Sequence, residues 1–347
     1  MKKEYDIVYL TNTPSFYKLN LCDEIGKRCR LLLVLYGYGS EAVNTELNDK
    51  ARWNFDYEFI NTGDSNSRSK VGTFLNLLKL MRSIRARKIL YAGWLAPEYN
   101  LYAFLSPKDR NVMVCESSIL DVNMGGFAGL IKRKIIGRMG ASLPSGLPHN
   151  ELFRSIGFKG RCNMTGSVGI FNKPHRTFVT AHDPLRYLYV GRLVEVKNIE
   201  LLIKTFNANG KLLTIVGAGP LEKSLKAMSK SNISFMGFIE NDRLGDVYQS
   251  HDVFILPSYY EPWGLVVEEA LYWGMPVIVS DRVGSADDMV RQLGTGEVFK
   301  SQDASSLQHA IDMMEAGYGM YRQNVIGIDW NMRDARQIDA YLSLLEP

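Results

Sequence analysis

Short apolar runs alternate with longer amphipathic runs along the first half of the chain. Apolar runs of about five residues are typical of buried strands, and apolar residues recurring with a period near 3.6 indicate helices. The expected strands span residues 6–10, 31–36, 88–92 and 112–115, and the expected helices span 17–28, 71–87 and 127–139. This alternation predicts a parallel, doubly wound α/β sheet of the Rossmann type.

The alternation stops within the segment FNKPHRTFVTAHDP, which has two prolines and no clear period. We interpret residues 171–183 as a linker, because prolines punctuate regular structure. A second alternation follows, with strands expected at 186–190, 211–216, 233–236, 253–256 and 277–279 and helices at 200–207, 220–229, 243–249, around Glu269 and at 331–345. The pattern therefore predicts two Rossmann-like domains, 1–170 and 184–330, with a closing segment at 331–347.

The charge is divided unequally between the two expected domains. The whole chain has a net charge of +4, whereas residues 1–170 hold 24 basic and 15 acidic residues, a balance of +9. Basic residues cluster at 68–88 and 132–138. Such clusters can bind anionic lipid, a phosphorylated substrate or nucleic acid, or they can be solvated helix faces. We do not expect nucleic acid, because no nucleic-acid-binding motif accompanies the clusters.

Composition places the chain in a reducing, aqueous compartment. Apolar runs are too short for a membrane-spanning helix, and the first apolar run is read as a strand instead of a signal peptide. The four cysteines, Cys22, Cys29, Cys115 and Cys162, form no CxxC pair. We therefore expect free thiols and a cytoplasmic protein. The Val71–Leu90 run mixes apolar and basic residues and suggests peripheral contact with the inner face of an anionic membrane.

The most informative segment is PSYYEPWGLVVEEALYWGMPVIV, which contains Glu261 and Glu269. It predicts a strand, a loop with one carboxylate, a helix with the second carboxylate, and a further strand. Ligands bind at the carboxyl ends of strands in sheets of this kind, so we place the chemistry here. Either Glu268 or Glu269 is expected to face solvent, because consecutive helix positions point about 100° apart.

The turn between the two carboxylates is suited to an anion. Pro262-Trp263-Gly264 should bend the chain sharply into the helix, and Gly264 allows close approach to the backbone. The amides of Trp263, Gly264 and Leu265 would lie at a helix N-terminus, which favours a phosphate group.

Two cations follow an earlier strand, in the sequence Val190-Gly191-Arg192 and then Lys197. An arginine can bind a diphosphate through two hydrogen bonds, and a lysine adds a point charge. Cations are common in loops, so this pair indicates a diphosphate site only in combination with the other motifs.

The segment IVGAGP could be a tight turn or a phosphate-binding loop. Its two glycines follow a strand and precede a helix, where amide groups can face an anion. A dinucleotide fingerprint requires a third glycine at position 222, which is Glu222, so a dehydrogenase is not expected.

These motifs occur in an order that resembles glycosyltransferase family 4, the retaining nucleotide-sugar transferases of GT-B fold. The matching text is VGRLVEVKN, IVGAGPLEKSL, FMGFIENDRL and ILPSYYEPWGLVVEEALYWGMPVIVSD, within about residues 185–290. The resemblance implies two Rossmann-like domains facing across a cleft and a C-terminal helix that crosses back to the N-terminal domain.

The resemblance also implies residue roles. Arg192 and Lys197 would hold the donor diphosphate and stabilise the leaving group, Glu261 would contact the transferred sugar, and Glu269 would bind the ribose. The remaining donor-binding residues would be Gly191, Trp263, Gly264 and Leu265, with Gly237, Phe238 and Ile239 along the nucleobase. Family members need no metal or other cofactor.

The N-terminal half departs from the family in two places. The usual glycine pair of the first loop is replaced by a loop that ends in Phe16 and Tyr17. The usual mid-domain histidine is replaced by Glu116 and Ser117. These four residues are candidates for contact with the acceptor or the sugar. Glu116 and Ser117 could instead form an ordinary polar loop cluster.

The leading hypothesis is a retaining hexosyltransferase that uses a nucleotide sugar, with UDP-sugar favoured and GDP-sugar possible. A glycan or a lipid-diphosphate-linked glycan would be the acceptor, as in the assembly of a surface polysaccharide. Two alternatives stay open: a GT-B sugar-nucleotide epimerase or phosphorylase, and a non-catalytic protein that binds a sugar nucleotide.

Overall fold

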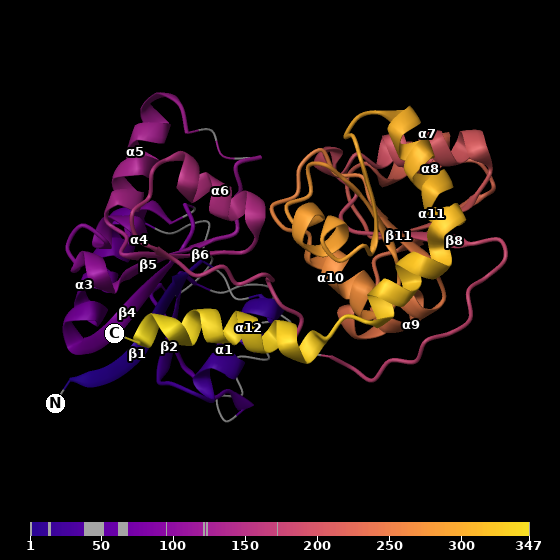
Figure 1. Ribbon diagram of the computed structural model, residues 1–347. Coiled ribbons are helices and arrows are strands. Elements are labelled where there is room, and N and C mark those ends of the chain that lie inside the picture. Colours follow the sequence, from indigo (N-terminus) through magenta and orange to yellow (C-terminus); the bar gives the residue numbers. More distant parts are fainter. Residues whose placement is uncertain are drawn as a thin grey trace. The chain divides into compact units, whose positions relative to one another are not determined.

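The computed structural model describes residues 2–12, 15–37, 52–61, 69–94, 96–120, 122, 124–171 and 173–346. The chain divides into two compact units, Met1–Asn172 with Asn331–Pro347, and Lys173–Trp330. Figure 1 shows both units and labels many of their helices and strands. Each unit is a parallel-sheet α/β domain, which confirms the predicted fold class.

The sheet of the first unit has the strand order β3-β2-β1-β4-β5-β6-β7, and the neighbouring strands are parallel. The strands are β1 Lys3–Thr11, β2 Leu31–Leu35, β3 Asp56–Phe59, β4 Ile84–Ala92, β5 Asn111–Cys115, β6 Ala141–Pro144 and β7 Arg161–Cys162. The helices are α1 Phe16–Gly26, α3 Lys70–Ser83, α4 Pro97–Tyr102, α5 Gly126–Gly137, α6 Leu147–Ser155 and α12 Trp330–Leu342.

Two apolar clusters cover the two faces of this sheet. Side chains of α3, α4, α5 and α6, including Leu77, Tyr99 and Ile136, form one cluster with alternate strand residues. Side chains of α1 and the closing helix α12, including Ile25 and Tyr341, form the other. The alternation of side chains along each strand explains this division, because successive residues point to opposite faces.

The sheet of the second unit has the order β10-β9-β8-β11-β12-β13, again parallel. Its strands are β8 Arg186–Val190, β9 Leu212–Val216, β10 Ile233–Gly237, β11 Val253–Leu256, β12 Val277–Ser280 and β13 Gly296–Phe299. Its helices are α7 Ile199–Asn209, α8 Glu222–Met228, α9 Leu244–Gln249, α10 Leu265–Tyr272 and α11 Ala304–Ile326.

One boundary prediction is wrong. The helix expected over residues 71–87 ends at Ser83, and the strand expected to begin at residue 88 begins at Ile84. Residues 84–86 pair with the start of β1, at Lys3, Glu4 and Tyr5, and this pairing overrides their helix-like apolar period. Several short elements were not expected at all: β3, β6, β7, β13, α4 and α6, together with the long helix α11.

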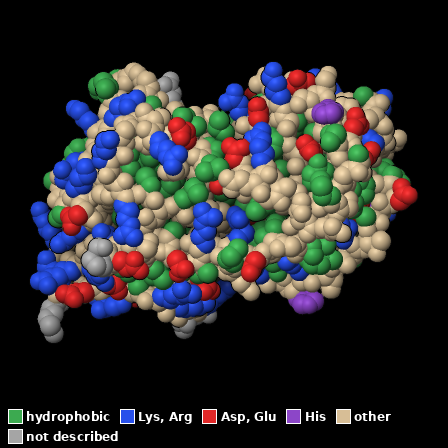
Figure 2. All heavy atoms as spheres, viewed as in Figure 1, with side chains coloured by type: hydrophobic (Ala, Val, Ile, Leu, Met, Phe, Trp, Pro, Cys, Tyr) green, Lys and Arg blue, Asp and Glu red, His purple; other side chains and the backbone are tan. Residues whose placement is uncertain are grey.

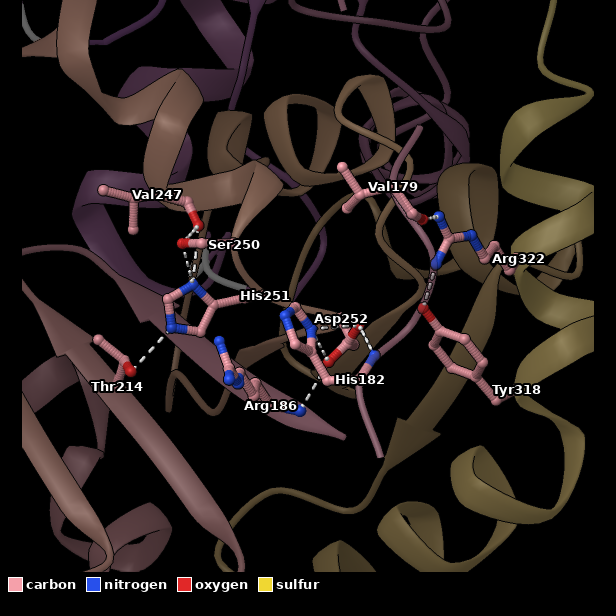
Figure 3. A network of polar contacts seen from close by, with 10 residues as sticks. All are labelled: Val179, His182, Arg186, Thr214, Val247, Ser250, His251, Asp252, Tyr318 and Arg322. Carbon is pink, nitrogen blue, oxygen red and sulfur yellow. Dashed lines mark hydrogen bonds and ion pairs between the residues drawn. The ribbon is translucent and has the colours of Figure 1, made fainter. Parts of the chain in front are cut away.

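A polar network ties the linker to the amino-terminal edge of the second sheet (Figure 3). The buried carboxylate of Asp252 accepts hydrogen bonds from the backbone amides of His182 and Arg186 at 3.0 and 2.8 Å, and it pairs with the His182 ring at 3.1 Å. Beside it, the ring of His251 lies 2.7 Å from the Val247 carbonyl and 2.8 Å from the Thr214 hydroxyl. The network therefore joins the linker, β8, β9 and β11.

Burial lowers the pKa of His251 below its ordinary value of 6.5. The unfolded chain then takes up this proton at a higher pH than the folded chain, so acid favours unfolding. We expect thermal stability to fall as the pH drops below about 6.5, and the variant His251→Gln to show a flatter dependence because its amide cannot titrate. Melting temperatures of both proteins between about pH 7.5 and 5 provide the test. Parallel pH profiles for the two would contradict it.

Candidate active site

The strand order of the second unit reverses between β8 and β11. The chain winds outward from β8 to β10 on one side and from β11 to β13 on the other. The loops that leave the carboxyl ends of β8 and β11 therefore diverge, and a crevice at this position is the usual ligand site of such sheets. Both predicted catalytic loops, after Val190 and after Leu256, begin here.

Arg192 follows β8 and is exposed. The hydroxyl group of Tyr189 donates a hydrogen bond to its backbone carbonyl at 3.1 Å and so holds the loop. Its guanidinium group forms no ion pair or hydrogen bond with the described residues. Arg192 is thus a positioned cation whose charge is available to an anion.

Lys197 and Glu261 form an ion pair across the switch point. Their side chains retain only 14% and 15% of their exposure. The backbone brings them together, because the amide of Tyr259 donates to the carbonyl of Val196 at 2.9 Å. The main chain of Glu261 is bonded in turn to the loop after β12, through Arg282 and Gly284. Two residues 64 positions apart in sequence therefore share one site.

The turn after Glu261 enters α10 as predicted. Gly264 caps the helix with a φ of 91°, a conformation that glycine adopts without strain. Within the described part of the chain, the amides of Gly264 and Leu265 donate no hydrogen bond to protein. The Trp263 side chain is buried, and its indole N–H donates to the carboxylate of Glu268. Any contact that Trp263 makes with a donor would therefore come from its backbone.

The expectation that Glu268 or Glu269 faces solvent is wrong. Glu268 is fully buried beneath Trp263, and Glu269 is largely enclosed. The Tyr248 hydroxyl donates to Glu269 at 3.0 Å. Burial raises the pKa of Glu269, an effect that the Tyr248 hydrogen bond opposes and the charge of Glu268 reinforces. Both carboxylates are held by aromatic donors on neighbouring elements.

The glycine segment after β9 packs as a tight turn. Gly217 has a φ of 134°, and its amide donates to the carbonyl of Gly237 at 2.7 Å. A Cβ on Gly217 would lie 1.9 Å from the carbonyl oxygen of Gly191, and α8 begins only at Glu222. These glycines allow the loops after β8, β9 and β10 to approach one another. The segment therefore forms a tight turn, which was the alternative to a phosphate-binding loop.

The expected nucleobase residues follow β10, two strands away from β8. Gly237 lies at a bulge in β10 with a φ of 71°. Phe238 is 69% exposed and Ile239 is half-buried. The Phe238 ring is therefore accessible to a planar ligand.

The four N-terminal candidates lie at the carboxyl edge of the first sheet. Tyr17 and Glu116 are neighbours, with 3.5 Å between the Tyr17 hydroxyl and the carboxylate. Phe16 is 37% exposed, and the Ser117 carbonyl accepts from the Cys115 thiol. Lys18, which sequence reasoning missed, is buried between Glu116 at 3.9 Å and the Thr11 hydroxyl at 3.2 Å.

Tyr248 and Tyr189 were also missed as parts of the second-unit site. Neither belongs to a motif, and an aromatic residue in a strand or helix ordinarily signals core packing. Their hydroxyl groups matter only because the fold places them beside Glu269 and Arg192. Among the described residues, no group of three or more His, Cys, Asp or Glu side chains could hold a metal ion.

Residues 172–325 match the family model of glycosyl transferases group 1. A curated relative, the uncharacterized glycosyltransferase MJ1607 of Methanocaldococcus jannaschii, is 30% identical over 181 residues, which is 50% of this chain and 43% of the relative. The chain thus spans less than half the length of this relative.

Solved structures match almost the whole chain in fold. Anabaena Alr3699/HepE in complex with UDP-glucose has a TM-score of 0.68 and 16% identity, and the match covers 98% of this chain and 99% of that one. The lipopolysaccharide outer core galactosyltransferase WaaB has a TM-score of 0.71 and 14% identity, covering 97% and 99%. At these identities the likeness establishes the fold alone, which is that of GT-B glycosyltransferases.

Replacing Gly217 by alanine tests the packing of the strand-end loops. We expect Gly217→Ala to lower the free energy of unfolding by about 2 kcal/mol or more, because the new methyl group meets backbone and not a flexible side chain. Gly210→Ala is the matched control. It also has a positive φ, of 72°, but open space around its Cβ position, so it should cost about 1 kcal/mol. Denaturant unfolding measures both, and equal losses would mean that backbone conformation alone sets the cost.

Proposed function

We propose that this protein transfers a hexosyl group from a nucleoside-diphosphate sugar to a hydroxyl group of a glycan or lipid-linked glycan, with retention of configuration. A UDP-sugar is the favoured donor, and a GDP-sugar is the second possibility. The proposal is supported by the group 1 match over residues 172–325, by the GT-B fold, and by the HepE structures, which contain UDP and UDP-glucose.

The observation that carries the proposal is the set of charges at the β8/β11 switch point. Arg192 supplies a cation that forms no ion pair or hydrogen bond with any described residue, and Lys197 lies against Glu261. The amides of Gly264 and Leu265 add donors at the start of α10. A diphosphate beside a sugar matches this arrangement, because its anionic oxygens meet cations and amides while the sugar hydroxyls meet a carboxylate.

The reaction breaks the bond between the anomeric carbon and the β-phosphate oxygen and forms a bond from that carbon to the acceptor oxygen. Negative charge grows on the departing diphosphate, and positive charge grows at the sugar ring. Arg192 and Lys197 stabilise the leaving group in the transition state more than in the ground state. The acceptor hydroxyl approaches on the leaving-group face, and its proton passes to a diphosphate oxygen.

Two further groups bind the donor in this proposal. Glu269, oriented by Tyr248, accepts hydrogen bonds from the ribose hydroxyls, and residues 237–239 lie along the nucleobase. No metal or other cofactor is proposed, because the two cations and the helix amides face the diphosphate charge. Full turnover in the presence of a chelator is the expected result.

Arg192→Ala should reduce sugar transfer by about 10²-fold, since it removes a charge partner of the leaving group. Lys223→Ala, at an exposed lysine of α8, is the matched control and should retain full activity. Release of nucleoside diphosphate and transfer of a labelled sugar, measured across a panel of donors and acceptors, provide the assay. Equal rates for Arg192→Ala and the parent would refute this site.

Conversion of the nucleotide sugar without any acceptor would indicate an epimerase, and tight binding with no product would indicate a non-catalytic protein.

Donor affinity should depend on the protonation of Glu269. Its raised pKa means that it takes up a proton at a higher pH than an ordinary carboxyl group near 4.5, and a neutral carboxyl is a poorer acceptor for ribose hydroxyls. We expect affinity for UDP to fall as the pH is lowered from about 7 toward that range. Glu269→Gln should bind about tenfold more weakly near neutral pH and lose this dependence. Calorimetry at several pH values tests both statements, and an unchanged pH profile in the variant would remove Glu269 from the ribose site.

A further inference from the structure

Helix α5 presents an apolar row to solvent. Phe127, Leu130 and Ile131 are 78%, 59% and 45% exposed. Their spacing of three and four positions places them on one side of the helix. Only Gly129 and Ile136 of this helix are buried. Contiguous apolar surface of this kind is uncommon on monomeric proteins and marks a site of contact with a protein, a membrane or a ligand.

The exposed face continues onto the neighbouring helices of the same layer. Helix α3 packs against α4 and exposes Val71 and Leu75. At the end of α5, the Arg138 side chain donates to the carbonyls of Ala103 and Ser106, just after α4, at 3.2 and 3.1 Å. The three helices therefore form one surface, which we call the α3–α5 layer.

The α3–α5 layer is basic as well as apolar. Helices α3 and α5 contain Lys70, Lys79, Arg82, Lys132, Arg133 and Lys134 and no acidic residue. The one carboxylate of α4, Glu98, is buried. Figure 2 shows Lys and Arg side chains predominating over this part of the molecule.

The cations of the α3–α5 layer differ in their ion pairing from the cations at the amino-terminal end of the first sheet. Lys3, Arg85 and Arg87, at the amino-terminal end of the sheet, form ion pairs with carboxylates. Of the layer cations, Arg133 and Lys134 form no ion pair with any described residue. Their charges are available to an external anion.

Topology places the apolar residues at a functional edge. Each helix of a parallel sheet begins where its preceding strand ends, so the first turns of α3 and α5 lie near the carboxyl edge. Val71 and Phe127 belong to these first turns. Ligands of such sheets bind at the same edge, where Glu116 lies.

We propose that the α3–α5 layer docks onto an anionic lipid bilayer, with the apolar row of α5 inserted among the acyl chains and the basic residues at the headgroup phosphates. This mode of contact lies on the membrane without spanning it, and none of the described helices is long and apolar enough to cross one. The pairing of insertable apolar groups with uncompensated cations favours a lipid surface over a protein partner. The docking does not require the proposed transfer activity.

The site differs from the one expected from the sequence. The run 71–90 was expected to contact the membrane, but residues 84–90 belong to the central strand β4, and Leu77 and Met81 are buried. Arg68, the first residue of the expected basic cluster, lies outside the described residues. The docking surface is carried by α5 with the first half of α3.

The test is cosedimentation of the full chain with vesicles of phosphatidylglycerol and phosphatidylcholine, or of phosphatidylcholine alone. We expect recovery with anionic vesicles at low salt, with partial loss in about 0.5 M NaCl. The double variants Phe127→Ser with Leu130→Ser, and Arg133→Glu with Lys134→Glu, should each weaken binding by about tenfold or more. Matched controls in the second unit are Met320→Ser, at a 58% exposed methionine, and Lys223→Glu with Lys300→Glu. Unchanged melting temperatures establish that every variant is folded.

Each outcome decides the proposal. Equal recovery with neutral and anionic vesicles, or an equal loss in the control variants, would overturn it. A dimer in sedimentation that disappears in the Phe127 variant, without lipid binding, would assign the face to a second copy of the chain and would also overturn it. Transfer to a water-soluble acceptor should be unchanged in the layer variants, so failure of the docking and failure of the proposed reaction are separable.

Discussion

Parallel pairing of β8 with β11 is the constraint on which the candidate site depends. Because every strand of the second sheet runs the same way, all loops that follow strands meet at one edge, and the reversal of strand order opens that edge between β8 and β11. Arg192 and Lys197 leave from one side of the opening and Glu261 from the other. The hydrogen bond between Tyr259 and Val196 fixes the distance between the two loops. A sheet with another winding would scatter the same residues.

The ion pair of Lys197 and Glu261 shows how the fold holds two opposite charges close together at the candidate site. Both charges are largely withdrawn from water, so each needs the other, and removal of one partner leaves a charge without compensation. A bound sugar diphosphate would offer both groups new partners of the right sign. The pair therefore compensates both charges in the absence of a ligand. Arg192, which has no ion pair within the described part of the chain, supplies the attraction for the anion.

The two units present different kinds of surface. The second unit holds the polar groups of the candidate site at the carboxyl edge of its sheet, where tyrosine and tryptophan side chains hold the carboxylates of Glu268 and Glu269. The first unit instead exposes apolar and basic residues across a helix layer, with few acids to balance them. The buried Lys18, between Thr11 and Glu116, is the exception, since it keeps one carboxylate oriented at the carboxyl edge of the first sheet.

The local pattern of the chain was enough to predict the fold class and the alternation of strands and helices, and it supplied candidates for the residues that carry the chemistry. Periodicity and short motifs are local signals, and the strands at 186–190 and 253–256 were predicted to the residue for that reason. Three features became apparent only in the folded structure: Ile84 begins a strand, Glu268 is buried, and Tyr248 donates a hydrogen bond to Glu269. Ile84 depends on β1, where it pairs with Lys3, and Glu269 depends on Tyr248, 21 positions away. Glu268 is only five positions from Trp263, but the turn at Gly264 has to form before the indole can reach its carboxylate. Strand pairing and side-chain burial depend on the three-dimensional arrangement of the chain and not on its local pattern, so they become visible only when the chain has folded.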